Sequence, residues 1–166
     1  MRYNRTLAGA AALCIATLLG TAPASAQVTT FPNSSDFPIA NAVEVGAGSK
    51  IIFHSGTTPA AANPDAERGT RAYYGDTRTQ TISVLERIEA DLESKGLTMG
   101  DVVKMTAFLV GDPEMGGRMD FSGFMEGYTQ FFGTDQQPNV PARSTVQVAG
   151  LVAPLMFVEI EVITAR

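Results

Sequence analysis

The last third of the chain holds the side chains that could bind an anion or activate water. Arg143 lies in one predicted strand, and Glu159 and Glu161 lie in the next, about sixteen residues further on. A guanidinium binds a carboxylate through two parallel hydrogen bonds, so Arg is better suited than Lys to bind this group. A nearby glutamate could then act as the base that activates water. The pattern also fits a solvated ion pair without a function, and taken alone it favours that alternative.

Two strands are expected to position these residues. Residues 142–149 and 155–163 alternate in polarity and are joined by a short link, which predicts a hairpin. In its register Glu161, rather than Glu159, lies more nearly opposite Arg143. The alternation gives the hairpin one face with Arg143, Thr145, Gln147, Phe157, Glu159 and Glu161. The other face carries Ser144, Val146, Val148, Val158, Ile160 and Val162, and we expect helices to cover it.

The elements before this pair complete a single sheet with two helices. The expected elements are a short strand at 43–45, a mostly buried strand at 50–54, a helix between Asp76 or Thr77 and Gly96, a strand at 102–110 with apolar residues on both faces, and a helix that carries Phe121 to Phe132. Residues 60–75 are predicted to form a long loop. The order β-β-α-β-α-β-β predicts an α+β sandwich with both helices on one face.

The two helices are expected to serve the core. Thr81, Leu85, Ile88 and Leu92 recur at helical spacing, and aromatic residues follow the same spacing from Phe121 onward. Such an aromatic stripe is more typical of core packing than of a cofactor site. On the first helix the opposite face carries three acids that we expect to be solvated, namely Glu86, Glu89 and Glu93.

The N-terminus has the features of a cleavable secretory signal. Arg2 and Arg5 precede an apolar stretch over residues 7–19, and Ala24-Ser25-Ala26 gives a small-x-small cleavage site. The stretch is shorter than the roughly 20 residues that a membrane helix needs. We therefore expect residues 1–26 to be removed and the product to be periplasmic or extracellular. Residues 27–37 are predicted to form a flexible arm, followed by one domain over 38–166.

Composition narrows the chemistry of the mature chain. Removing Arg2 and Arg5 takes the twelve basic residues to ten against seventeen acidic ones, a formal charge of −7, which disfavours nucleic-acid binding. The only cysteine, Cys14, leaves with the signal, so neither a disulfide nor a cysteine nucleophile is expected. His54 is the only histidine and should point away from the adjoining Ser55, which argues against a metal site and a Ser-His-Asp triad.

Several short motifs together resemble the Rid family of enamine/imine deaminases. The motifs are Ser55-Gly56, Lys95-Gly96-Leu97, Asp101-Val102-Val103-Lys104, Tyr128, Phe131-Phe132, Pro141-Ala142-Arg143-Ser144 and Glu159-Ile160-Glu161. They occur in the family's order over nearly the whole mature chain. The most specific part is Pro-Ala-Arg-Ser followed by Glu-Ile-Glu, whereas Ser-Gly alone is weak.

The resemblance implies a chorismate-mutase-like α+β fold, usually a homotrimer with clefts between subunits and with neither a metal nor an organic cofactor. It implies hydrolysis of reactive 2-imino or 2-enamino acids to 2-keto acids and ammonia. Arg143 then binds the substrate carboxylate and Glu159 positions the attacking water. The backbone around Thr145 and the Ser55-Gly56 turn line the pocket. Burying the polar face that carries Arg143 against a neighbouring subunit would strengthen its hold on an anion.

Three departures from the family pattern keep a second hypothesis open. A tyrosine frequent in the family's N-terminal segment is replaced here by Ile39 or Ala40, a helical asparagine by Met125, and a cysteine by Thr145. These changes remove polar contacts but leave the Arg-plus-Glu pair. The alternative is a non-catalytic exported trimer that binds small carboxylates or acts as a holdase. A ribonuclease role ranks lower because the mature chain is acidic.

Overall fold

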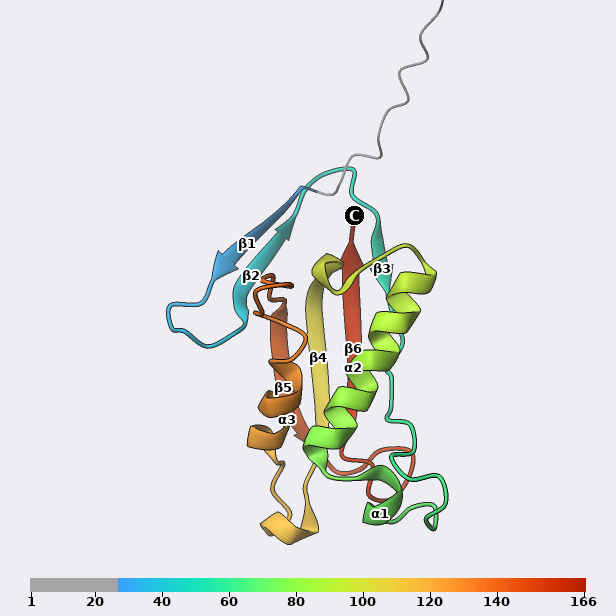
Figure 1. Ribbon diagram of the computed structural model, residues 1–166. Coiled ribbons are helices and arrows are strands. Elements are labelled where there is room, and N and C mark those ends of the chain that lie inside the picture. The colour runs from blue at the N-terminus through green and yellow to red at the C-terminus, as the bar shows by residue number, and fades with distance from the viewer. Residues whose placement is uncertain (1–26) are drawn as a thin grey trace, which may run out of the picture.

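The computed structural model describes residues 27–166, so the predicted signal at 1–26 lies outside the described residues. The elements in chain order are β1 (Val28–Pro32), β2 (Ala40–Val45), β3 (Ile51–Phe53), α1 (Arg71–Tyr74), α2 (Thr77–Ser94), β4 (Val102–Val110), α3 (Phe121–Tyr128), β5 (Ala142–Val148) and β6 (Val158–Ala165), with short 3-10 helices at Met99–Asp101 and Pro113–Met115. Figure 1 shows α2 and α3 side by side on one face of the sheet. The predicted α+β class and its order are confirmed, with β1 and α1 added.

The six strands lie in the order β1-β2-β5-β4-β6-β3. The strand β4 is central, parallel to β5 on one side and antiparallel to β6 on the other. Its apolar residues on both faces predicted a central position between two packing layers. Within one chain only the helix side of β4 is fully buried, and its residues on the other face are half-buried. The strand β3 forms one edge of the sheet next to β6.

The predicted hairpin between the last two strands is wrong. Because β4 lies between them, β5 and β6 are not neighbours. The helix α3 connects the parallel strands β4 and β5, as parallel pairing requires, and the link 149–157 then carries the chain past β4 to its other side. Alternating polarity records which residues share a face of one strand, but it does not identify the neighbouring strand.

The predicted common face of Arg143 and the two glutamates is therefore also wrong. Arg143 pairs with Met105, which pairs with Val162, and both of these apolar side chains are buried under the helices. Paired residues on adjacent strands point to the same side of a sheet, so Arg143 points toward the helices. By the same rule Glu159 shares the opposite face with Phe108 and Val146. We call that opposite face the uncovered face, defined by Ile51, Phe53, Phe108, Val146, Glu159 and Glu161.

Two predictions for the N-terminal half also need correction. The segment 27–37 was expected to be a loose arm, but Val28–Pro32 forms β1 and pairs antiparallel with β2. The strand at 50–54 was expected to be mostly buried, yet Ile51 is 51% and Phe53 76% exposed. Ile52 between them packs against the core, so its two neighbours point to the uncovered face, where no described helix shields them.

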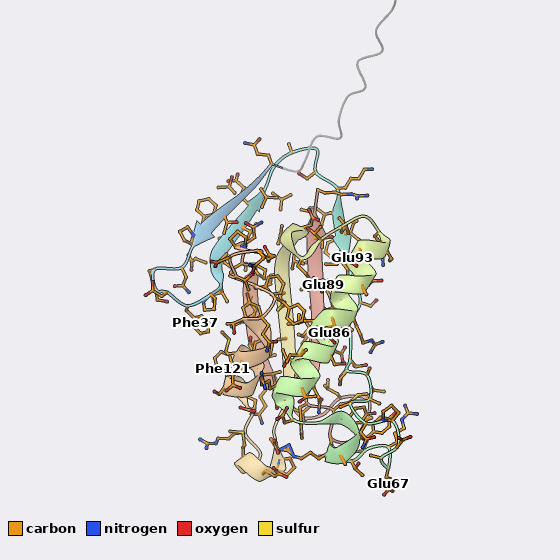
Figure 2. The ribbon with its side chains drawn as sticks, in the orientation of Figure 1. Phe37, Glu67, Glu86, Glu89, Glu93 and Phe121 are labelled. Atoms are coloured by element: carbon orange, nitrogen blue, oxygen red, sulfur yellow. The ribbon has the colours of Figure 1, made fainter. Side chains whose placement is uncertain are left out.

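The predicted core and first helix are confirmed, whereas the second helix, expected to carry Phe121 to Phe132, ends at Tyr128. The α2 helix starts after Asp76, whose carboxylate accepts a hydrogen bond of 2.8 Å from the Thr79 amide, and Gly96 follows its end at φ +68°. Figure 2 shows Glu86, Glu89 and Glu93 along this helix; Glu86 and Glu93 are exposed and Glu89 is half-buried. The buried side chains that join the two helices to the sheet include Val84, Leu85, Ile88, Leu92, Met105, Leu109, Phe124, Tyr128, Phe132, Val158 and Ile160.

None of the helices within residues 27–166 has the length and apolar character needed to cross a membrane.

Candidate active site

The Arg143 guanidinium lies in a cage of aromatic rings. Its central carbon is 4.2 Å from the ring centre of Tyr128, 5.0 Å from that of Phe124 and 5.5 Å from that of Phe37. Each ring offers its electron-rich face to the cation. Beside them, Nη2 of Arg143 donates a hydrogen bond of 3.2 Å to the sulfur of Met125. Three of the four caging residues come from α3 and the fourth from the segment before β2.

The charge of Arg143 has no anionic partner among residues 27–166. The ion pairs in this part of the chain involve other residues. Nη1 of Arg143 is buried without a hydrogen-bond partner, and so is Oγ1 of Thr145, two residues along the same strand face. Burial lowers the pKa of Arg143, and the neighbouring Tyr128 opposes that shift. A half-buried cation with unused donors is a site prepared for an anion.

Tyr128 connects this cage to the segment that precedes β2. Its hydroxyl donates a hydrogen bond of 2.9 Å to the carbonyl of Pro38, and its ring stacks on that of Phe132 at 5.0 Å. Burial raises the pKa of Tyr128 to about 12, so the phenol stays neutral at ordinary pH. Phe37, next to Pro38, stacks on Phe121 with ring centres 6.2 Å apart, and the two lie beside each other in Figure 2. These contacts hold Phe37 over the guanidinium.

Glu159 lies elsewhere, against the Ser55-Gly56 turn. Thr57 and Ile160 exchange backbone hydrogen bonds of 2.8 and 3.0 Å, which brings the turn beside β6. A Cβ atom on Gly56 would lie only 2.1 Å from Oε1 of Glu159, so glycine is needed to seat the carboxylate there. None of the ion pairs in the described part of the chain occupies Glu159.

The predicted site residues thus form two groups that one chain does not join. Arg143 and Thr145 lie together on the helix side of the sheet, whereas Ser55, Gly56 and Glu159 lie together on the uncovered face or at its edge. The sheet itself separates the two groups. One chain therefore presents the Arg143 guanidinium and the Glu159 carboxylate in opposite directions.

His54 sits beside the second group but is occupied by structural contacts. Its Nε2 is 3.0 Å from Oγ1 of Thr164, its Nδ1 is 3.4 Å from a carboxylate oxygen of Asp91, and its side chain is almost buried. These contacts tie the edge strand β3 to β6 and α2. A cavity of about 340 Å³ lies here, lined by His54, Ser55, Gly56, Asp91 and Lys95 among others. Within residues 27–166 no cluster of three or more metal-ligating side chains is present.

Sequence reasoning missed the aromatic cage. Phe124 and Tyr128 were assigned to the core, and both are indeed buried, but their ring faces also receive Arg143. Their helical spacing alone could not reveal this second role. Phe37 had no signal at all, because the segment around it shows little periodicity. What places it is the hydrogen bond between Tyr128 and Pro38.

Comparisons with a family model and with individual relatives point to the same protein family. A family model described as Endoribonuclease L-PSP matches residues 35–166. The putative reactive intermediate deaminase TdcF of Escherichia coli K12 is 33% identical over 129 residues, covering 78% of this chain and 87% of the relative. The 2-iminobutanoate/2-iminopropanoate deaminase of Salmonella typhimurium is also 33% identical over 129 residues, covering 78% and 88%.

Solved structures share the fold. A Rid-family protein of unknown function from Yersinia pestis superposes with a TM-score of 0.63 at 22% identity, covering 84% of this chain and 98% of that one. The structure of Escherichia coli TdcF with bound serine gives a TM-score of 0.55 at 34% identity, covering 74% and 84%. The chorismate-mutase-like fold expected from the sequence is thereby confirmed.

Proposed function

Because this chain belongs to the Endoribonuclease L-PSP (Rid) family, which includes relatives named as imine deaminases, we propose that it hydrolyses reactive 2-imino and 2-enamino acids to 2-keto acids and ammonia. The ribonuclease activity in the family's description suits this chain poorly, because without residues 1–26 it has a formal charge of −7, which disfavours binding to phosphates. The proposed hydrolysis of imino acids needs neither a metal nor an organic cofactor.

The observation that carries the proposal is the unsatisfied Arg143 site. The guanidinium has a buried, unpartnered Nη1, and Thr145 has a buried, unpartnered hydroxyl on the same face. A substrate carboxylate accepts hydrogen bonds from both groups and neutralises the cation. In a site of low dielectric such charge-assisted bonds are about twice as strong as neutral ones. The contact with the weakly accepting sulfur of Met125 is easily given up for a carboxylate oxygen.

The complete site forms between two subunits. Arg143 and Glu159 of one chain point to opposite sides of the sheet, so Glu159 can reach a ligand on Arg143 only from a second chain. The uncovered face also exposes apolar side chains that a neighbour would bury, namely Ile51, Phe53 and Val146. We propose a closed homotrimer in which this face of each subunit meets the next.

In the reaction, Glu159 accepts a proton from water while the water oxygen bonds to C2 of the imino acid. The electron pair of the C=N bond moves to nitrogen, and Glu159 returns the proton there. The carbinolamine then collapses: the C–N bond breaks, the C=O bond forms and ammonia leaves with a proton from the hydroxyl group. An enamine follows the same route after protonation at C3. Positioning and proton transfer of this kind contribute about 10²–10⁴ in rate.

The proposal is tested with the chain from Gln27 onward and an imino acid generated by an amino-acid oxidase. Semicarbazide trapping follows the loss of the imine against a buffer control. We expect accelerated loss that disappears in Arg143→Ala and Glu159→Gln. Equal loss with and without protein for several imino acids would contradict the deaminase assignment.

A second candidate, a non-catalytic carboxylate-binding protein, is favoured by the apolar surroundings of Arg143, because none of the described side chains that contact the guanidinium is a carboxylate or an imidazole. Under this candidate the wild type binds small carboxylates in calorimetry without accelerating imine loss. Glu159→Gln preserves that affinity under either candidate, whereas Arg143→Ala removes it. Unchanged affinity in Arg143→Ala would contradict both.

We also propose that the protein is exported after cleavage between Ala26 and Gln27, on the basis of the N-terminal pattern. Cell fractionation followed by N-terminal sequencing tests this: the expected product begins at Gln27 outside the cytoplasm. A cytoplasmic product that still carries Met1 would contradict it.

A further inference from the structure

The groups around the Arg143 donors are aromatic or aliphatic, apart from Thr145. Phe37, Phe124 and Tyr128 face the guanidinium with their rings, and Met125 faces it with its thioether. The Tyr128 hydroxyl donates its proton to the carbonyl of Pro38, so its oxygen can only accept from the neighbouring guanidinium and has no proton left for a ligand. A ligand bound at Arg143 therefore has its charge recognised by the guanidinium, while the side chains around that group offer its remaining atoms mainly apolar contacts.

Two of these walls can adapt to a ligand. Met125 is half-buried and unbranched, and within residues 27–166 its sulfur has one polar contact, the 3.2 Å hydrogen bond from Arg143. When a carboxylate takes that donor, the thioether is released and can pack against the group attached to C2. Phe37 is 38% exposed and lies at the outer side of the cage, stacked on Phe121. Phe124 and Tyr128, in contrast, are fully buried and fixed.

We propose that Met125 and Phe37 are specificity-determining residues that select 2-imino acids with an apolar side chain larger than a methyl group. This inference rests on the proposed function, because it names the substrate class of the same site. The carboxylate is held by Arg143 and Thr145, and the C2 substituent lies against Met125 and Phe37. A charged or hydrogen-bonding substituent loses its water there without gaining a partner.

The expected discrimination follows from burial. Each methylene group transferred from water to an apolar wall favours binding by about 0.8 kcal/mol, or roughly fourfold. The imine derived from leucine carries three more carbons than the one from alanine, so we expect a preference of at least tenfold in kcat/KM. The imine derived from aspartate buries a second carboxylate without a partner, and we expect it to be about a hundredfold poorer than the leucine imine.

The experiment measures kcat/KM for the imines of alanine, leucine and aspartate with wild type, Met125→Asn and Met125→Leu. Met125→Leu keeps an apolar wall of similar size and serves as the matched control, so its preference should stay unchanged. Met125→Asn should reduce the leucine-to-alanine ratio by about tenfold and improve the aspartate imine. Thermal unfolding confirms that each variant is folded, and Phe37→Ala provides an independent test from outside α3.

Calorimetry with the corresponding stable 2-keto acids separates this inference from the proposed function. If no imine is hydrolysed but the keto acid derived from leucine binds at least tenfold more tightly than pyruvate, the deaminase assignment fails and the selectivity stands. If imines are hydrolysed at equal kcat/KM, or if both Met125→Asn and Phe37→Ala leave the ratios unchanged, the selectivity is wrong and the deaminase stands. Preference for the aspartate imine in the wild type overturns it as well.

Discussion

Mixing two inactive variants should restore activity if the site spans two subunits. Arg143→Ala removes charge-assisted hydrogen bonds of about 1.5–3 kcal/mol each, and Glu159→Gln removes a proton acceptor that contributes about 10²–10⁴ in rate. Each variant alone has one defective half at every interface, Arg143 in the first variant and Glu159 in the second, and is therefore inactive. Because Arg143 and Glu159 face opposite sides of the sheet, one chain cannot supply both groups to one pocket.

The restored fraction can be calculated. An intact site combines Arg143, which the Glu159→Gln subunit still carries, with Glu159, which an adjacent Arg143→Ala subunit still carries. At equal amounts each condition is met with a probability of roughly one half, so about one quarter of all sites are intact in any closed ring. If the two variants carry different affinity tags and only mixed oligomers are purified, a trimer retains about one third of wild-type activity and a dimer about one half.

The assay is imine loss per subunit in co-expressed, doubly purified protein, with each variant alone and wild type as controls. Mass determination of the mixed oligomer shows that the subunits have assembled together. Activity no higher than that of the single variants, in verified mixed oligomers, would refute the placement of the site between subunits. The same result would leave the carboxylate-binding role of Arg143 intact.

Three further predictions concern single positions. Gly56→Ala should lower kcat at least tenfold with little change in Tm, because the new Cβ displaces the flexible Glu159 carboxylate; a normal kcat with a folded chain would contradict this placement of Glu159. Asp76→Ala should cost about 0.5–2 kcal/mol in urea unfolding at pH 7, whereas Asp76→Asn still caps α2. The Thr79 amide lowers the pKa of Asp76, so the wild-type advantage should shrink as pH falls below about 4, and a constant difference down to pH 2 would contradict the cap. The pKa of Tyr128 is raised from 10 in the unfolded chain to about 12 in the folded one. In a pH titration followed by absorbance at 295 nm, the phenol should therefore ionise at higher pH in the folded chain than in the unfolded one. The free energy of unfolding should also fall as pH rises from 10 to 12, and Tyr128→Phe should abolish both effects.

The local elements were predictable because their signals are local. The α2 helix begins and ends where its cap residue and its terminal glycine predicted, and β4 spans 102–110 as expected. The apolar stripe of α2 and the aromatic stripe of α3 pack into one core. Periodicity and capping depend on residues within one or two turns of each other, so a single sequence contains the information.

The polar members of the candidate site were predictable from the family resemblance, but its aromatic cage and its arrangement were not. The resemblance supplied Arg143, Thr145, Glu159 and the Ser55-Gly56 turn, and the structure brings them together as two groups. The expected hairpin placed Arg143 and the glutamates on one face, which the order of strands contradicts. The cage around Arg143 depends on Phe37, more than a hundred residues earlier in the chain.

The sequence by itself therefore determined α2, β4 and the core stripes, since these follow from side-chain period and capping, whereas the family resemblance supplied the candidate residues Arg143 and Glu159. Only the tertiary structure decided that β4 separates β5 from β6 and that Arg143 faces the helices while Glu159 faces away from them. The physical reason is that alternation along a strand fixes which side chains share a face of that strand, whereas its partner strands decide which way that face points.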